Sequence, residues 1–444
     1  MLQSQPVRRN LDLEAALTEA RNKYAERRPR SAALHAEAKT SMPGGNTRTV
    51  IHFGPYPFTI SRGDGAHVHD ADGFVYADFL GEYTAGLYGH NNPLIEAAVK
   101  SALKGGVALG GPNLVEAKLA ALLCQRFAAP QRIRFCNSGT EANILALSTA
   151  RAHTGRDEIL VMDGAYHGSV LTFAGASPLN LPFTIHRTPY NDAEMAVAKI
   201  KALGERLAAV LIEPMIGAGG CVPASHAFLA ALRKATEESG AMLIFDEVMT
   251  SRLTAGGLQG YHGITPDLAS FGKYLGGGLT FGAFGGAAEI MERFDPARPD
   301  HWPHAGTFNN NILSMTAGYT GLSEIYTAEV ADAFFDRGNA FRTALQEDLA
   351  RLDLPVVVTG MGSMTAFHFT RITPTTPPVA AEMPKDLLEL IHLDMAERGQ
   401  FHARRGMFNL SLPMTDADLE GFRRAFVEVL EERAPLIETV IGHA

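Results

Sequence analysis

Short runs rich in apolar residues alternate with longer amphipathic segments through the middle of the chain. Such runs, bounded by polar or turn residues, are typical of buried strands. They cover residues 132–135, 159–162, 208–212 and 241–245. Segments with apolar positions at helical spacing lie between and beside them, at residues 94–103, 113–127, 140–153, 192–203 and 225–239. This alternation predicts an α/β fold over about residues 79–322, with a mainly parallel sheet and helices on both faces.

The two ends of the chain follow other patterns. Near the start, Asn10 suits a helix N-cap, and apolar positions recur at helical spacing after it, at Leu13, Leu17, Ala20 and Tyr24. A glycine-rich loop at 42–48 follows, and turn signals then divide residues 58–80 into three short strands. Beyond Thr327 the patterns predict a helix at 328–352, strands at 355–360, 363–369 and 407–412, a Pro/Thr-rich loop at 373–383, and a last helix from Asp416. These C-terminal elements predict an α+β unit.

Composition places the chain among ordinary globular enzymes. Its 444 residues are 46% hydrophobic and 20% charged, which excludes a disordered or fibrous protein. The net charge of -9 argues against nucleic acid and against anionic membranes as partners. No apolar run approaches the roughly 20 residues of a membrane span, and the first residues lack the apolar core of a signal peptide, so we expect neither feature. Cys124, Cys136 and Cys221 are scattered without ligand spacing, so we expect reduced thiols in a cytoplasmic protein.

Two of the predicted strands end at groups with complementary chemistry. The apolar run at 241–245 stops at Asp246, and a short strand at 267–272 is followed at once by Lys273 and then by three glycines. The carboxyl ends of parallel strands are where open α/β sheets bind ligands. Lys273 alone could be a surface lysine, but a lysine paired with a strand-end aspartate suits pyridoxal phosphate. The amine holds the cofactor aldehyde, and the carboxylate keeps the ring nitrogen protonated.

The same residues carry a resemblance to a known family. The sequences FDEVMTSR (245–252) and SFGKYLGGG (270–278) resemble class III pyridoxal-phosphate-dependent aminotransferases, which have the fold type I architecture. Within that class the chain is most similar to the β-amino-acid (β-phenylalanine) aminotransferases, and glutamate-1-semialdehyde aminomutase is a further relative. The resemblance implies a large cofactor-binding domain at 79–322. It also implies a small domain that combines residues 1–78, including an N-terminal arm, with residues 323–444.

The resemblance assigns a phosphate-binding role to the turn at 137–142. This turn lies where a strand gives way to a helix, and free N–H groups, hydroxyls and the helix dipole there can hold a phosphate. The family uses the positions of Ser138, Gly139 and Thr140 for the cofactor phosphate. Ser and Thr also suit a plain N-cap, so the turn by itself leaves both roles open.

Other positions match family residues around the cofactor ring. The resemblance implies that Tyr166 stacks on the ring and that Val248 presses on its opposite face. Glu213 ends the strand at 208–212 and is expected to face the same crevice, although a purely structural role is open. His167 either supports the site or packs beside it.

Three further positions imply a partner subunit and a substrate. Thr307 matches the threonine that reaches the phosphate of the neighbouring subunit in fold type I relatives, which implies a homodimer. Arg48 and Arg405 match the carboxylate-binding arginines of β-phenylalanine aminotransferases, and a guanidinium suits a carboxylate because it donates two parallel hydrogen bonds. Arg404 precedes Arg405, so the two could exchange roles.

The resemblance implies an aminotransferase that moves the amine of a β-amino acid, such as 3-amino-3-phenylpropanoate, to 2-oxoglutarate or pyruvate. In this reading Lys273 also removes and returns the C3 proton. Two alternatives remain open. An aminomutase would move the amine within one substrate, and a non-catalytic module would keep the fold without the reaction. A regulator of that second kind would need a DNA-binding segment, and no basic helix-turn-helix pattern is visible.

Overall fold

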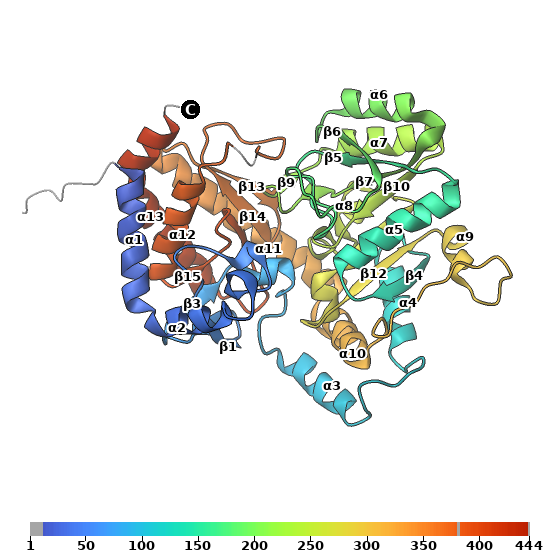
Figure 1. Ribbon diagram of the computed structural model, residues 1–444, viewed down its shortest axis with the longest axis horizontal. Helices are drawn as coiled ribbons and strands as arrows, with labels where there is room; N and C mark the ends of the chain where they lie inside the picture. The colour runs from blue at the N-terminus through green and yellow to red at the C-terminus, as the bar shows by residue number, and fades with distance from the viewer. Residues whose placement is uncertain (1–11, 380–381, 443–444) are drawn as a thin grey trace, which may run out of the picture.

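The computed structural model describes residues 12–379 and 382–442, which form two lobes (Figure 1). The larger lobe is built around a seven-stranded sheet. The smaller lobe holds elements from both ends of the chain, including α1 and α13. The predicted N-cap Asn10 and residues 380–381 of the Pro/Thr-rich loop lie outside the described residues.

The seven-stranded sheet has the order β4-β12-β11-β10-β7-β5-β6. Its strands are β4 (Arg132–Cys136), β5 (Glu158–Met162), β6 (Thr184–Thr188), β7 (Leu207–Ile212), β10 (Met242–Asp246), β11 (Leu268–Gly272) and β12 (Gly282–Gly286). Only β12 runs antiparallel to its neighbours, β11 and β4. The predicted α/β architecture with a mainly parallel sheet is confirmed.

Two strands of this sheet were missing from the sequence prediction, β6 and β12. In β12 the sequence GAFGG lacks the branched residues that mark a strand, because neighbouring backbone approaches too closely for side chains. A Cβ on Gly282 would lie only 2.3 Å from the carbonyl oxygen of Ser138. Strand β6 lies at the edge of the sheet and has the sequence TIHRT, in which most residues are polar. It therefore lacks the apolar run that marks a buried strand.

Helices pack around the sheet. The first five of the large lobe lie where the alternation predicts, with small changes at their ends, and the last three were not predicted. Those of the large lobe are α3 (Pro93–Leu103), α4 (Glu116–Arg126), α5 (Gly139–Thr154), α6 (Ala193–Leu203), α7 (His226–Ser239), α8 (Gly257–His262), α9 (Ala288–Met291) and α10 (Ile312–Thr320). The predicted start of α4 at Asn113 is wrong by three residues. Asn113 instead accepts hydrogen bonds from Val115 N and Glu116 N before the helix begins.

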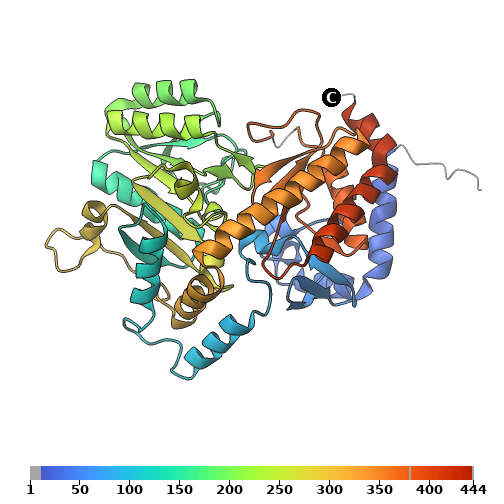
Figure 2. The same ribbon diagram turned by 180° about the vertical axis from the view of Figure 1, so that it is seen from behind.

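The smaller lobe joins the two ends of the chain in one sheet. Strand β15 (Gln400–Phe401) runs parallel to β3 (Val75–Asp78), which continues the meander of β1 (Ile60–Asp64) and β2 (His67–Asp70). A second sheet contains β13 (Val357–Met361), β14 (Met364–His368) and β16 (Met407–Asn409). The helices are α1 (Leu13–Arg27), α2 (Pro29–Ala38), α11 (Ala328–Leu352), α12 (Lys385–Glu397) and α13 (Asp416–Ile441). Figure 2 shows α11 extending from the large lobe across the small one.

The centre of the large sheet brings its polar strand ends together. All residues of β10 and β11 are buried, and the two strands run parallel with Asp246 opposite Ser270. Lys273 follows Ser270 by three residues, so it emerges at the same edge as Asp246. At that edge β4 also leads into α5. Among the described residues, no helix is both long and apolar enough to cross a membrane.

Candidate active site

A pocket of about 120 Å³ lies at this edge of the sheet. Its walls come from the start of α5, the loop after β5, and the ends of β7, β10 and β11. It is lined by Gly139, Thr140, Asn143, Tyr166, His167, Gly168, Glu213, Asp246, Val248, Met249 and Lys273. Seven of the residues expected to bind the cofactor therefore meet in one place: Gly139, Thr140, Tyr166, Glu213, Asp246, Val248 and Lys273.

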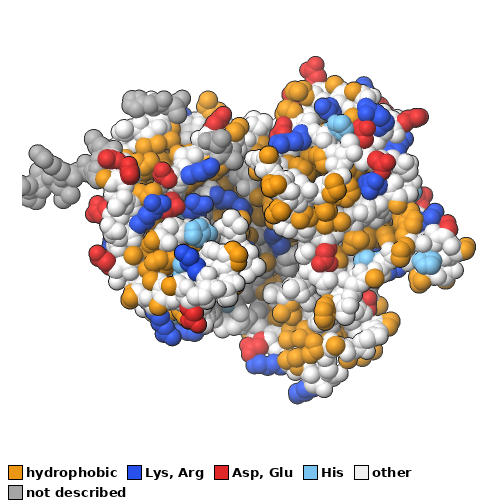
Figure 3. Space-filling model, in the orientation of Figure 1, with side chains coloured by type: hydrophobic (Ala, Val, Ile, Leu, Met, Phe, Trp, Pro, Cys, Tyr) orange, Lys and Arg blue, Asp and Glu red, His pale blue; other side chains and the backbone are white. Residues whose placement is uncertain are grey.

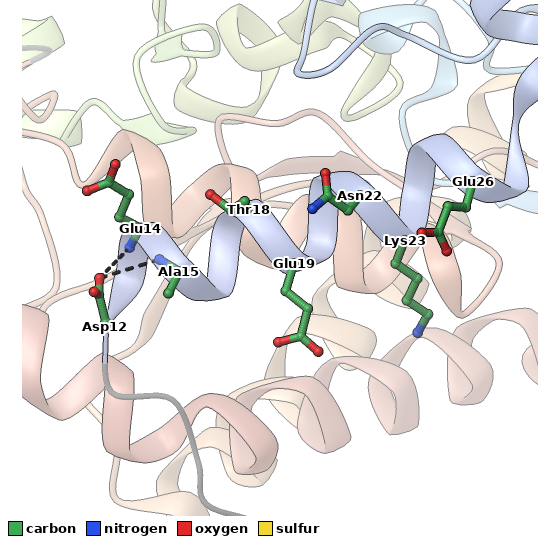
Figure 4. Close-up of a pocket in the computed structure, with 8 residues that line it drawn as sticks. All are labelled: Asp12, Glu14, Ala15, Thr18, Glu19, Asn22, Lys23 and Glu26. Atoms are coloured by element: carbon green, nitrogen blue, oxygen red, sulfur yellow. Dashed lines mark hydrogen bonds between the residues drawn. The ribbon is translucent and has the colours of Figure 1, made fainter.

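A larger hollow of about 600 Å³ lies elsewhere, along α1 (Figure 4). Its eight lining residues all belong to α1 or to its N-terminal cap, and four of them are carboxylates: Asp12, Glu14, Glu19 and Glu26. None of the predicted site residues lines it. A shallow acidic surface of one helix offers nothing to hold an aldehyde, a ring and a phosphate together.

Lys273 has an unusual backbone and an altered side-chain pKa. It adopts a left-handed conformation with φ of 54°, which side-chain-bearing residues rarely adopt. Such strain persists where surrounding structure imposes it, often at functional sites. Burial lowers the pKa of the Lys273 amine, while Asp246 and Glu213 oppose that shift. A lowered pKa increases the neutral, nucleophilic fraction of the amine.

Asp246 is buried and surrounded by hydrogen-bond donors. Its Oδ2 accepts from Asn143 Nδ2 at 2.8 Å and lies 2.8 Å from His167 Nδ1, while Oδ1 accepts from Val248 N at 3.0 Å. Because an ionised carboxylate can only accept, His167 Nδ1 must carry a hydrogen. These contacts fix the position of the carboxylate in the pocket.

Asn143 and Ser270 belong to this arrangement and were not predicted. Asn143 lies one turn after Gly139 on the same face of α5, and its Nδ2 also donates to the carbonyl of His167 at 3.0 Å. Ser270 Oγ donates to Asn143 Oδ1 at 2.5 Å, which fixes the orientation of the amide. A buried asparagine among the alanines of α5 was the available signal. His167, whose role the sequence left open, contacts Asp246 directly.

The start of α5 is capped by a serine and presents free backbone N–H groups. Ser138 caps the helix, because its side chain accepts from Glu141 N at 3.2 Å, so this residue fills the N-cap role considered above. The N–H groups of Gly139 and Thr140 follow in the first turn, where helix donors lack intrahelical partners. A Cβ on Gly139 would lie 2.7 Å from Val248 Cγ1, so only glycine fits.

Tyr166 and Glu213 are linked through the backbone. Tyr166 N donates to Glu213 Oε1 at 2.9 Å, and Gly217 N donates to Glu213 Oε2 at 3.0 Å. Burial raises the pKa of Glu213 to about 7, while His167 opposes the shift. The Tyr166 side chain is 39% exposed, whereas Val248 is almost fully buried. Glu213 thus braces the loop that presents the Tyr166 ring.

The predicted substrate arginines lie close to one aromatic ring. The guanidinium carbons of Arg48 and Arg405 lie 5.5 and 5.0 Å from the centroid of the Tyr83 ring. Arg48 is also paired with Glu82, and both side chains are partly exposed. Arg405 Nε is buried and has no hydrogen-bond partner within the described part of the chain. Arg404 pairs instead with Glu389 at 3.3 Å.

Thr307 does not line the pocket of its own chain. It lies in a separate hollow of about 560 Å³, together with residues 107–113, Glu116, Phe308 and residues 310–312. Exposed apolar side chains surround this region and the adjoining helix α3, as the lower part of Figure 3 shows. They are Leu94, Leu103, Val107, Leu109, Leu114 and Phe308.

The pocket suits pyridoxal phosphate. Three features face one cavity: an amine of lowered pKa, a buried carboxylate held by hydrogen-bond donors, and the start of a helix with free N–H groups. The missing Cβ of Gly139 leaves room for the side chain of Val248, which lines the same pocket.

Comparison with known proteins gives consistent matches over almost the whole chain. The profile of the family described as Aminotransferase class-III matches residues 52–389. The chain is 45% identical to the β-phenylalanine transaminase of Variovorax paradoxus, over 92% of this chain and 94% of that protein. It is 38% identical to glutamate-1-semialdehyde 2,1-aminomutase 2 of Anoxybacillus flavithermus, over 90% and 98%. The solved structure of a β-phenylalanine aminotransferase from V. paradoxus superposes with a TM-score of 0.94 at 44% identity, covering 96% of this chain and 99% of that one.

Proposed function

The chain belongs to the class III aminotransferases of fold type I, and from that membership we propose that it moves the amine of a β-amino acid to a 2-oxo acid. The donor class is that of 3-amino-3-phenylpropanoate, and the acceptor is 2-oxoglutarate or pyruvate. One observation carries the proposal: two arginines, Arg48 and Arg405, share the Tyr83 ring beside the pocket of Lys273. The resemblance to a β-phenylalanine transaminase supports it.

The cofactor of this reaction is pyridoxal phosphate, which supplies an aldehyde for the amine and a ring that accepts electrons. Lys273 and Asp246 would hold the aldehyde and the ring nitrogen. Gly139 and Thr140 would hold the phosphate, with Ser138 fixing the start of their helix. Tyr166 and Val248 lie where they can cover the two faces of the ring, and Glu213 supports Tyr166.

Lys273 also moves the proton that the reaction requires. Its amine would remove the hydrogen on C3 of the substrate as a general base and would hold that proton for return in the same half-reaction. Its lowered pKa favours the neutral form that can accept this proton. With the cofactor bound, the carboxylate of Asp246 would keep the ring nitrogen protonated, which would favour the same proton transfer.

Two arginines solve a geometric problem that a β-amino acid creates. Its carboxylate is one carbon further from the reacting carbon than that of a 2-oxo acid, so one anchor cannot serve both substrates equally. We assign Arg48 to the β-amino acid and Arg405 to the 2-oxo acid. The unpartnered Nε of Arg405 leaves a donor for a carboxylate, and Arg48 exchanges its contact with Glu82 for the substrate.

The working enzyme is a homodimer in this proposal, and Thr307 contacts the phosphate bound mainly by the other subunit. The exposed apolar side chains around Thr307 support a subunit contact there. We also assign residues 79–322 to the large domain and residues 1–78 with 323–444 to the small one, which the pairing of β3 with β15 supports. Three free thiols suit the reducing cytoplasm.

A single-turnover experiment tests the function and separates it from an aminomutase. The purified holoenzyme is mixed with a panel of amines, and the change of cofactor absorbance and the released products are followed. We expect β-amino acids to convert the cofactor and to release one equivalent of free oxo acid. An aminomutase would retain its intermediate and release an isomer of the donor. Conversion by α-amino acids or simple amines alone would refute the proposed substrate class.

A further inference from the structure

Three successive residues beside the pocket have a backbone conformation that side-chain-bearing residues avoid. Glu82, Tyr83 and Thr84 all have positive φ, at 48°, 51° and 82°. Left-handed residues other than glycine normally occur singly, because Cβ crowds the backbone there. A run of three is therefore disfavoured unless neighbouring contacts impose it.

A buried arginine holds the backbone at the C-terminal end of this run. Arg252 is 1% exposed, and it donates to the carbonyl of Thr84 at 2.9 Å and to that of Leu410 at 2.5 Å. No carboxylate pairs with it within residues 12–379 and 382–442, and burial lowers its pKa to about 10. Burying a charge against uncharged backbone carbonyls is unfavourable for folding. The hydrogen bonds of Arg252 therefore act mainly by fixing the backbone of the two segments that they join.

The other end of the run is held by a carboxylate. Asp78 Oδ1 accepts from Leu80 N at 3.1 Å and from Gly81 N at 3.0 Å. Asn409 Nδ2 donates to the carbonyl of Leu80 at 2.9 Å, which ties the segment to β16 a few residues beyond Arg405. The run is therefore anchored on both sides to the segment that carries Arg405.

The result is the placement of Tyr83. Its ring lies near both guanidinium groups, and its hydroxyl donates to the carbonyl of Val50 at 2.7 Å, two residues after Arg48. One side chain thus contacts the loop of Arg48 and the guanidinium of Arg405. The negative face of an aromatic ring attracts guanidinium groups and reduces the repulsion between two like charges nearby.

We propose that Tyr83 is a positioning residue that sets where Arg48 and Arg405 lie relative to each other, with Arg252 as its brace. The spacing of the two anchors then decides which distances between carboxylate and amine the enzyme accepts. This inference rests on the proposed function, because it takes both arginines to be carboxylate anchors. It adds the residue that determines their geometry.

The test compares ring-removing and ring-keeping variants of the holoenzyme. Tyr83→Leu removes the aromatic face, and Tyr83→Phe keeps it while losing the bond to Val50. For Tyr83→Leu we expect kcat/KM for 3-amino-3-phenylpropanoate and for 2-oxoglutarate to fall about tenfold, mainly through KM, a loss within the range for cation–π contacts. The half-reaction of 1-phenylethylamine, which lacks a carboxylate, should stay within about twofold because it uses neither anchor.

Matched controls separate position from general damage. Tyr83→Phe should remain within about threefold of the wild type for every substrate. Tyr56→Leu removes a half-buried tyrosine whose hydroxyl, like that of Tyr83, donates to backbone carbonyls, here those of Ala25 and Arg28, and it should change no kinetic constant. If Tyr83→Leu does not fold, Tyr83→Phe is compared with the same protein carrying trifluorophenylalanine at position 83. Fluorination weakens the ring face with little change of shape, so KM for carboxylated substrates should rise.

The outcomes also distinguish this inference from the proposed function. If Arg48→Ala and Arg405→Ala leave carboxylated substrates unaffected, the anchor assignment itself fails. If those variants lose activity toward carboxylated substrates but Tyr83→Leu or the fluorinated ring does not, the positioning role of Tyr83 is refuted. Equal losses for 1-phenylethylamine, or a Tyr83→Phe variant as impaired as Tyr83→Leu, would refute it as well.

Discussion

Replacement of Arg48 by alanine tests the assignment of the donor carboxylate. Arg48 lies 5.5 Å from the Tyr83 ring and is paired with Glu82. In the proposed complex the substrate carboxylate takes the place of Glu82, so the variant loses a charged hydrogen-bond pair with the β-amino acid. A donor without a carboxylate never makes that contact.

The magnitude follows from the environment of Arg48. A hydrogen bond to a charged group contributes about 1.5–3 kcal/mol. The Arg48 side chain is 42% exposed, so solvent and salt screen the interaction toward the lower end of that range. A loss of about 1.5–2 kcal/mol corresponds to a decrease of about 10–30-fold in kcat/KM for the β-amino acid.

The assay measures the first half-reaction by the change in cofactor absorbance. Wild type and Arg48→Ala are each mixed with 3-amino-3-phenylpropanoate or with 1-phenylethylamine, the same amine without its carboxylate. The ratio of the two kcat/KM values isolates the contribution of the carboxylate. Glu82→Gln serves as a control, because it removes the competing charge of Glu82 and should lower KM for the carboxylated donor.

Equal losses for both amines would show that Arg48 shapes the loop and does not bind substrate. A loss confined to the 2-oxo acid half-reaction would show that the two arginines have exchanged the roles assigned here. In that case Arg405→Ala, which should impair the acceptor, would instead impair the β-amino acid.

Further predictions concern the cofactor, the subunit contact and acid stability. Borohydride reduction of the holoenzyme followed by peptide mapping should find the cofactor on Lys273, and a label on another lysine would contradict the mechanism. Mixed dimers of a Lys273→Ala chain and a Thr307→Ala chain should keep one intact site, whereas two impaired sites would contradict a contact across the interface. Burial lowers the pKa of His402 to about 3, so the folded protein keeps it neutral while the unfolded chain protonates it below about pH 6.5. The free energy of unfolding should therefore fall as the pH drops below about 6.5. Between about pH 6.5 and pH 4 the Tm of His402→Phe should fall less than the Tm of the wild type. A Tm difference between the two proteins that does not change with pH would refute this. The raised pKa of Glu213 acts in the opposite direction but is common to both proteins.

Local sequence patterns predicted five of the seven strands of the large sheet, helices α3 to α7 and the edge at which the candidate site lies. Asp246 and Lys273 could be placed because each directly follows a short apolar strand, and parallel strands end together. The start of α5 was visible from its capping residues for the same reason: a cap is a local feature.

Residues whose role depends on distant partners could not be predicted. Asn143 and Ser270 matter because they meet at Asp246 from different elements, and a polar residue within a helix or a strand does not by itself show where its partner lies. Strand β12 was missed because its glycines are required by the close approach of neighbouring backbone, and its partner strands β4 and β11 come together only in the folded protein. The role proposed for Tyr83 could not be predicted either, since the position of its ring depends on distant residues: Arg252 and both substrate arginines.

Transfer of a labelled amine tests the central claim most directly. The holoenzyme is incubated with 3-amino-3-phenylpropanoate labelled with ¹⁵N and with unlabelled 2-oxoglutarate or pyruvate, and the products are analysed by mass spectrometry. The account predicts ¹⁵N in the newly formed 2-amino acid, together with an equal amount of the 3-oxo acid from the donor, and neither product with Lys273→Ala. Label that stays in the donor or appears in a rearranged isomer of it would contradict the assignment as a β-amino-acid aminotransferase.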